Sequence, residues 1–352
     1  MRTFPRTQIC VVSPLALALL AGSTALAGIS QATLVAPGGF VQAGAGPSTT
    51  GSPGWPGLDW TPYHAAPGSD VHEASFSGVS TATTSASYAV GTTSNSGSGT
   101  CGMGWVVLNG ANSAPNSAQA PRGECNGGWK ETFLITHPSY TGQTGYMQFT
   151  VHATAFLFAS GFAGSAALDV TAYKDNIQLM NNALANPGNS DPIGTDRQYG
   201  HWAIATYGNP PTDSKNVNGT VTFAVPFTFG TPFSLGVYAC AYGGMRSQSS
   251  VPGISTGQAG NPATVNWTGI TNIFVNNVPI SGASLSSGTG LNWGGQLQPP
   301  APEDLNQDGV VDGTDLGILL GSWGPCAGCP ADINGDGTVD GTDLGLLLGA
   351  WT

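Results

Sequence analysis

The chain has 352 residues and a formal net charge of −11, with 8 Lys and Arg against 19 Asp and Glu. So few basic residues argue against nucleic acid as a partner, because phosphate binding requires Lys or Arg to displace counterions. The length suggests one large domain or two unequal ones.

Residues 1–27 have the features of a secretory signal peptide. Arg2 and Arg6 supply a positive start, residues 11–20 form an apolar run, and residues 25–27 are a small-residue cleavage site. The run is too short to cross a bilayer, which takes about 20 apolar residues. The alternative is a buried N-terminal helix. We predict a mature protein that starts near Gly28, has no membrane span, and is secreted or located at the cell surface.

Residues 28–298 are predicted to form one β domain. Residues 28–67, rich in Gly, Pro and Ser, are expected to be loosely held. Residues 147–155 then place Met, Phe, Val and Ala on one parity and polar residues on the other, as in a strand with one buried face. At 156–158 apolar residues occupy both parities, which indicates either burial on both faces or a bulge.

Residues 221–229 repeat the alternation, and Pro226 on the opposite parity indicates an edge strand or a bulge, because proline cannot donate to a ladder. Further strands are expected at 103–108, 131–136, 166–172, 201–206, 233–239 and 264–275, and a short helix at 177–185. Many strands without strand–helix alternation predict an antiparallel β-sandwich, jelly-roll-like in architecture.

Three segments of this domain resemble a known group. Residues 145–149, 227–233 and 267–270 are similar to secreted bacterial β-sandwich proteins sorted by PEP-CTERM tails, although this chain lacks that tail. A proline-rich linker at 299–302 is expected to separate the sandwich from an acidic end, because proline favours an extended spacer.

The large domain shows no catalytic constellation, and we predict that the protein is not an enzyme. Ser255 lies in a G-x-S-x-G match, but no His follows it as a nucleophile elbow requires. The acids Glu73, Glu124, Glu131 and Asp169 could be nominated for glycoside hydrolysis, yet their spacing selects no pair.

Cysteine and aromatic residues leave two further expectations. Cys101 and Cys125 are expected to form a disulfide, which suits an exported protein, and Cys240 is then left over. The aromatic residues either fill the core or include a sugar-stacking platform. The candidates for such a platform are Trp55, Trp60, Tyr63, Trp105, Trp129, Trp202, Trp267 and Trp293.

The final segment, 303–352, has nine acidic residues, no basic one, and an internal repeat. Residues 304–323 and 332–351 align without gaps, and 15 of the 20 positions are identical. Each copy opens with an EF-hand-like loop, in which side-chain oxygens at positions 1, 3 and 5 converge, Gly at position 6 permits the bend, and position 7 offers its carbonyl. The alternative is an acidic solvated turn that binds nothing.

The loops predict two calcium ions, whose binding we expect to be coupled to folding because converging carboxylates repel one another without a metal. The ligands expected at site one are Asp304, Asn306, Asp308, the Val310 carbonyl, Asp312 and Asp315. Those expected at site two are Asp332, Asn334, Asp336, the Thr338 carbonyl, Asp340 and Asp343.

A helical spacing of apolar residues follows each loop. The residues at i, i+3, i+4 and i+7 are Leu316, Leu319, Leu320 and Trp323 in the first copy, and Leu344, Leu347, Leu348 and Trp351 in the second. Each set is expected to form one apolar face of a short helix, and the two faces are expected to be buried together.

With Asp at loop position 12 and a Cys326-x-x-Cys329 link between the copies, this segment resembles the GC-type dockerin modules of exported bacterial proteins. The resemblance implies a small all-α calcium-binding module at 303–352 and a Cys326–Cys329 disulfide, with free thiols as the alternative. It also implies that loop positions 10 and 11 face a partner, either a cohesin-like protein or another surface protein. Those positions are Gly313, Thr314, Gly341 and Thr342.

These features together favour an exported, non-enzymatic β-sandwich protein that is tethered or displayed through its calcium-dependent end. The alternative is a carbohydrate-binding or polysaccharide-degrading component of a dockerin-organised surface complex, with polysaccharide as a further partner. A third possibility is an enzyme of a type that the motifs do not reveal.

Overall fold

The computed structural model describes residues 36–46, 69–118, 121–175, 177–179, 200–206, 212–245, 250–295, 297, 301–306, 311–326 and 328–351. The chain divides into two compact units between residues 297 and 298. The predicted signal peptide lies outside the described residues. Within them, no helix is long and apolar enough to cross a membrane.

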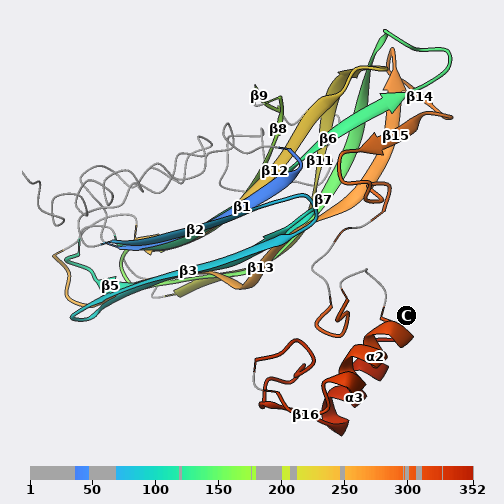
Figure 1. Cartoon of the computed structure of the whole chain (residues 1–352). Helices are drawn as coiled ribbons and strands as arrows, with labels where there is room; N and C mark the ends of the chain where they lie inside the picture. The colour runs from blue at the N-terminus through green and yellow to red at the C-terminus, as the bar shows by residue number, and fades with distance from the viewer. Residues whose placement is uncertain are drawn as a thin grey trace, which may run out of the picture. The chain divides into compact units, whose positions relative to one another are not determined.

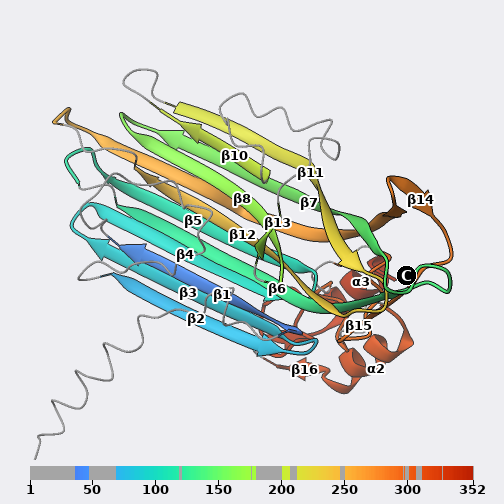
Figure 2. The same cartoon turned by 90° about the horizontal axis from the view of Figure 1, so that it is seen from above.

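The described residues of the first unit form two antiparallel sheets that lie face to face as layers (Figures 1 and 2), an arrangement that fits the predicted β-sandwich. Sheet A runs in the order β10 (Gly200–Ala205), β8 (Gly164–Lys174), β12 (Phe233–Met245), β6 (Arg122–Thr136), β1 (Gly38–Gly46) and β2 (Asp70–Ser77), with β9 (Ile177–Gln178) against β8 and β15 (Ser284–Ser287) against β6. Sheet B runs in the order β11 (Thr212–Thr228), β7 (Thr144–Ser160), β13 (Ile254–Val275), β5 (Trp105–Pro115), β4 (Thr93–Gly102) and β3 (Thr81–Val90), with β14 (Val278–Ile280) against β13.

Strand alternation builds the core between the sheets. On β7, Met147 and Phe149 are fully buried and Gln148 between them is half-buried, as the sequence pattern predicts. Leu157 is also buried, while Phe156 and Phe158 point outward and are half-buried, so β7 keeps its alternation where both alternatives expected it to fail. The expected edge strand is confirmed, because Pro226 lies on β11 at the border of sheet B.

One end of the sandwich is closed by the chain that follows β15. Trp293 is buried and packs edge-on against Trp267 and Phe133, with ring centroids 5.0 and 5.2 Å apart. The Trp267 indole N–H donates to the Trp293 carbonyl at 2.9 Å, and the Leu297 N–H donates to the Trp267 carbonyl at 2.9 Å. These contacts make Trp293 part of the core, with Leu291 and Leu297 packed against it.

Further along the same strands, the sheets meet through glycine. A Cβ atom added to Gly257 of β13 would lie 1.9 Å from the Ser165 carbonyl oxygen of β8, and one added to Gly97 of β4 would lie 2.0 Å from the Glu124 carbonyl oxygen of β6. Facing sheets ordinarily lie about 10 Å apart with side chains between them. Here backbone packs on backbone, so the glycines are required by close approach of the two layers.

Two expectations for this unit are wrong. Residues 38–46, within the stretch expected to be loosely held, form β1, a fully buried strand inside sheet A. The segment is mostly Gly and Ala, so it lacks the large apolar residues that make alternation visible. Residues 177–178 form the strand β9 through pairing with β8, where a helix was expected, and 180–185 lie outside the described residues.

The expected disulfide between Cys101 and Cys125 is also wrong, because both cysteines are buried free thiols, as is Cys240. Cys101 lies on β4 and donates its Sγ–H to the Gly128 carbonyl at 3.0 Å. Cys125 lies on β6 of the opposite sheet, and its Sγ would be 2.6 Å from a Cβ on Gly99. Each sulfur therefore packs against backbone. Burial raises the pKa of the Cys101 and Cys125 thiols, which keeps them protonated.

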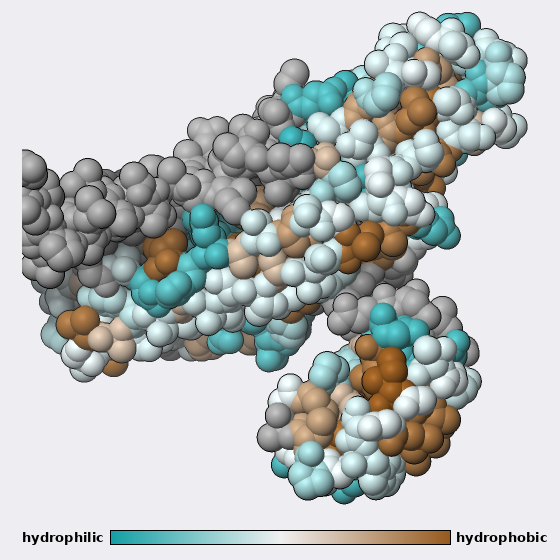
Figure 3. Space-filling model, in the orientation of Figure 1, coloured by the Kyte–Doolittle hydropathy of each residue, from teal (hydrophilic) through white to brown (hydrophobic). Residues whose placement is uncertain are grey.

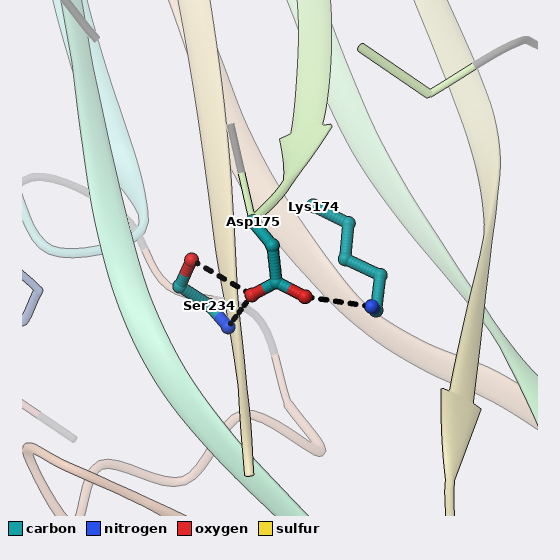
Figure 4. A network of polar contacts seen from close by, with 3 residues as sticks. All are labelled: Lys174, Asp175 and Ser234. Carbon is teal, nitrogen blue, oxygen red and sulfur yellow. Dashed lines mark hydrogen bonds and ion pairs between the residues drawn. The ribbon is translucent and has the colours of Figure 1, made fainter. Parts of the chain in front are cut away.

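A polar contact ties the end of β8 to the start of β12 (Figure 4). The Asp175 carboxylate accepts hydrogen bonds from the Ser234 N–H at 2.8 Å and from its hydroxyl at 3.2 Å, and it pairs with the Lys174 ammonium at 2.7 Å. Partial burial raises the pKa of Asp175, but the bonds from Lys174 and Ser234 outweigh it and leave the pKa lowered.

The second unit has two short helices among its described residues, α2 (Gly313–Gly321) and α3 (Gly341–Gly349). It is not all-α as expected, because β16 (Gly324–Pro325) pairs with β17 (Thr338–Val339). Its core consists of Val311, Leu319, Ala331, Val339 and Leu347. Ala301, expected to belong to the linker, packs against this core and accepts the Asp304 N–H at 2.9 Å, so it is part of the folded unit.

Candidate metal centre

Each loop of the second unit leads into its helix through an aspartate cap. Asp312 and Asp340 are the N-cap residues of α2 and α3, and their carboxylates accept the N–H groups of Thr314 and Thr342, both at 2.7 Å. The third helical residue, Asp315 or Asp343, accepts the cap's own N–H at 2.9 Å, which completes a capping box in both copies. The two copies of the sequence repeat therefore form the same hydrogen bonds at the start of their helices.

Asp315 and Asp343 also hold the two ends of each loop together. The second carboxylate oxygen of Asp315 accepts the Asn306 N–H at 3.0 Å, and that of Asp343 accepts the Asn334 N–H at 3.1 Å. Both aspartates are fully buried. Loop position 12 therefore contacts positions 3 and 9 in both copies, although nine residues separate positions 3 and 12 in the chain.

The second loop, whose six expected ligands are all described, is curved by its own side chains. The Asp332 carboxylate accepts the N–H groups of Asp336 at 3.0 Å and Gly337 at 2.8 Å. The Asn334 amide oxygen accepts the Asp336 N–H at 2.9 Å, and the Asp336 carboxylate accepts the Thr338 N–H at 3.0 Å. Positions 1, 3 and 5 therefore face the inside of one turn of chain.

The first loop is described in part. Asp304, Asn306, Asp312 and Asp315 are described, and Asp304 is buried. The expected ligands Asp308 and Val310 lie outside the described residues.

Hydrogen bonding lowers the pKa of Asp315 and Asp343, the buried carboxylates at loop position 12. The N–H of Asp340 lowers the pKa of Asp343, and the N–H groups of Asn334 and Ile333 add to that effect against the opposing influence of burial. At Asp315 burial is the largest influence and raises the pKa, but bonds from Asp312, Asn306 and Leu305 together outweigh it, so the pKa is lowered. Ionised carboxylates are the form that binds a metal.

The donor set of these loops fits a hard cation. The expected ligands are carboxylate, amide and carbonyl oxygens only, the pattern that suits calcium, and residues 303–352 contain no Lys or Arg to neutralise their nine acids. Among the described residues, no group of three or more His, Cys, Asp or Glu side chains lies close enough to hold a metal ion. The carboxylate oxygens of the aspartates in the two loops accept backbone N–H groups and retain lone pairs for a further contact.

Cys326 and Cys329 form a disulfide between the two copies. The Cys326 N–H also donates to the Gly337 carbonyl at 3.0 Å, which fastens this link to the second loop. The expected partner-facing residues Gly313, Thr314, Gly341 and Thr342 are all exposed in the first turns of the helices.

The helices bury less of their apolar surface than expected. Leu319 and Leu347 are fully buried, but Leu320 and Leu348 are each 52% exposed, and Trp323 and Trp351 are 51% and 46% exposed. Figure 3 shows hydrophobic surface on this unit. The expected burial of both whole faces is therefore wrong, because two nine-residue helices that meet each other cover only part of their circumference. Each copy instead presents three apolar side chains at equivalent positions, which are Ile318, Leu320 and Trp323 in the first copy and Leu346, Leu348 and Trp351 in the second.

The candidate catalytic and sugar-stacking residues of the sandwich have structural roles where they are described. Ser255 is fully buried in strand β13, donates to the Asn116 side chain at 2.7 Å and accepts the Ala163 N–H at 3.0 Å, so it is not at an elbow. The tryptophans Trp105, Trp129, Trp202, Trp267 and Trp293 are all buried. Trp55, Trp60 and Tyr63 lie outside the described residues.

The four acids nominated for hydrolysis do not converge. Glu131 is buried on the inward parity of β6 and accepts N–H groups of residues 288 and 289, so it fixes the chain after β15. Glu124 and Asp169 lie on the outward parity with β12 between their strands, and Glu73 lies on the edge strand β2. The sequence analysis missed a different feature, the outward Ser and Thr residues of β3 and β4, whose alternation with Gly and Ala was the available signal.

In comparisons with known proteins, no family model and no curated protein matches this chain.

Proposed function

We propose that residues 301–352 are a dockerin-like module that binds two calcium ions and attaches the β-sandwich to a protein partner outside the cell. The observation that carries this proposal is the same set of hydrogen bonds around Asp315 and Asp343 in two oxygen-only loops. A capped helix in both copies, and in the second copy a loop curved by its own side chains, leave the metal to neutralise the acids, a contribution that would stabilise the unit.

The exposed apolar residues supply the proposed docking surface. Leu320 and Trp323 on one copy correspond to Leu348 and Trp351 on the other, and a Leu–Trp pair is the kind of group that is buried on association. Because the positions are equivalent, the partner could bind in either of two orientations. The sandwich, in which no catalytic group has been brought together among the described residues, is then the displayed part, without enzymatic activity.

Calcium titration of the purified mature chain tests the metal site. We expect two bound ions, with Asp336→Asn weakening one of them by about tenfold or more, because it removes one charged ligand. Glu303→Gln is the matched control, since Glu303 lies in the same unit and is not among the expected ligands. Failure of the unaltered chain to bind calcium contradicts the proposal.

Capture of a partner tests docking. The mature chain, immobilised with calcium, is expected to retain a protein from an envelope extract of the native organism and to release it with chelator. The double variant Leu320→Ser/Leu348→Ser should bind calcium normally and lose that protein. If the protein is retained equally with and without chelator, and equally by the unaltered chain and the variant, the docking proposal is contradicted. Mass spectrometry of the exported chain should show a start near Gly28.

A further inference from the structure

The outward face of sheet B differs in chemistry from the rest of the sandwich surface. Among the described strands of this sheet, charged residues occur on β11 alone, where Asp213 and Lys215 lie near its start. The outward side chains of β3, β4, β5, β7 and β13 are mainly Ser, Thr, Asn and Gln. Most of them are exposed or half-buried, so this face is an uncharged and mainly polar surface, interrupted by Val107 on β5 and by Phe156 and Phe158 on β7.

Strand register arranges these side chains in rows across the sheet. One row crosses six strands and consists of Thr83, Thr100, Val107, Thr264, Thr154 and Asn218. A second consists of Ala89, Ser94, Ser113, Thr256, Ser160 and Thr212. Neighbours within a row are about 4.8 Å apart, and successive outward positions along a strand are about 6.8 Å apart. The face is therefore a regular array of hydroxyl and amide groups.

Neighbouring hydroxyls within the array bond to each other and still keep hydrogen-bonding capacity. The Oγ1 atoms of Thr154 and Thr264 are 2.7 Å apart, those of Thr150 and Thr268 are 2.6 Å apart, and those of Thr83 and Thr100 are 3.0 Å apart. A hydroxyl has one donor and two acceptor sites, so each such pair retains one hydrogen and several lone pairs for a ligand. The bonds also hold the side chains in fixed rotamers, which lowers the entropic cost of ordering these side chains when a ligand binds.

Aromatic rings border the polar array at one end. Tyr146 and Phe274 are stacked with ring centroids 4.5 Å apart and planes at 11°. Register places Pro226 beside Tyr146 and Pro279 beside Phe274, so four rings cross β11, β7, β13 and β14 in one row. From Tyr146 to Ser160 the outward face of β7 is about 48 Å long at 3.4 Å per residue. That length suits a polymer rather than a single small molecule.

We propose that the outward face of sheet B binds an extended, uncharged polysaccharide. Hydroxyl and amide rows complement the many hydroxyls of such a chain, and the ring row offers C–H contacts to sugar rings. The near absence of charge matches a neutral polymer and disfavours nucleic acid or a polyanion, which require basic side chains. Protein-binding surfaces are typically centred on exposed large aromatic residues and Arg. The described strands of sheet B carry no Arg, and the outward Phe156 and Phe158 of β7 are half-buried.

Adsorption of the purified mature chain to suspensions of cellulose, chitin and an insoluble β-1,3-glucan tests this proposal. We expect retention on at least one of them, unchanged between about 0.05 and about 1 M NaCl, because screening weakens only charged contacts. Retention should persist with chelator, which separates it from the proposed calcium-dependent docking. Polygalacturonate, a polyanion, should be bound more weakly.

The double variant Thr154→Val/Thr264→Val removes two central hydroxyls at nearly constant shape, and we expect it to weaken adsorption by about tenfold. The matched control is Thr132→Val/Thr136→Val on the outward parity of β6 in sheet A, which should adsorb like the unaltered chain. Circular dichroism verifies that both variants are folded. The proposal is overturned if the unaltered chain adsorbs to none of the three polymers, or if the sheet B variant adsorbs as well as the control. Self-association of the unaltered chain that the sheet B variant abolishes would assign the face to a second copy instead.

Discussion

The two sheets of the sandwich share one core, but the outward residues of the two sheets differ in burial and in charge. On sheet A, outward residues such as Glu124, Tyr238, Cys240 and Tyr242 are buried. Most of the charged residues in the described strands of this unit belong to sheet A. On sheet B, the outward residues are exposed or half-buried and almost uncharged. The outward face of sheet B is exposed and carries hydroxyl and amide groups, while two outward acids of sheet A, Glu124 and Asp169, are buried.

The largest expected effect comes from the close approach that joins the sheets. Gly257→Ala places a methyl group 1.9 Å from the Ser165 carbonyl oxygen, so the layers must separate, and we expect a loss of about 3 kcal/mol or more in the free energy of unfolding. Gly127→Ala is the control, because its methyl group would lie 3.3 Å from a flexible Leu108 side chain. Denaturant unfolding measures both. Equal losses would contradict a backbone contact specific to Gly257.

An intermediate effect is expected from the buried charge of sheet A. Burial raises the pKa of Glu124, although Arg122 and Asn126 act in the opposite direction. The folded state then holds this proton more tightly than the unfolded state does. Stability should therefore fall as pH rises from the ordinary glutamate pKa to the raised value, and should stay level above it. Glu124→Gln cannot ionise and should lack that fall, so the difference in unfolding free energy between variant and parent should change with pH. If the difference in unfolding free energy between Glu124→Gln and the parent is the same at every pH from acid to neutral, the raised pKa of Glu124 is contradicted.

The smallest effect on stability is expected on the open face. Thr154→Val/Thr264→Val removes one cross-strand hydroxyl bond but keeps β-branched residues in the strands, so unfolding free energy should change by less than about 1 kcal/mol. Thermal unfolding checks this value. A large loss would show that the hydroxyl rows support the fold, and would weaken the case that they serve a ligand.

The sequence predicted those parts of the fold that large apolar residues define. Strands β6, β7, β11, β12 and β13 carry Phe, Val, Leu and Trp on one parity, and each lies where alternation placed it. Strands β1, β3 and β4 consist mainly of Gly, Ala, Ser and Thr, whose alternation is weak in hydropathy. The burial of β1 and of the inward positions of β4 depends on glycines that let the two layers approach, and that approach is a property of both sheets together.

The candidate metal loops were predictable for a different reason. Their positions are fixed by local spacing, and the capping boxes of Asp312 and Asp340 form within four residues of chain. Which helix residues remain exposed depends on how the two copies pack against each other. Leu319 and Leu320 are equally apolar in sequence, yet one is fully buried and the other exposed.

The position of Trp293 has a consequence for the order in which the protein can be completed. Its ring packs with Trp267 and Phe133, and its carbonyl accepts the indole N–H of Trp267. A chain emerges from the ribosome from its N-terminus, so every strand from β1 to β15 is synthesised before the residue that closes the core. Until then one end of the apolar interior stays open to water. The sandwich is therefore built to remain incomplete during nearly all of its own synthesis and to close only when its last residues are available.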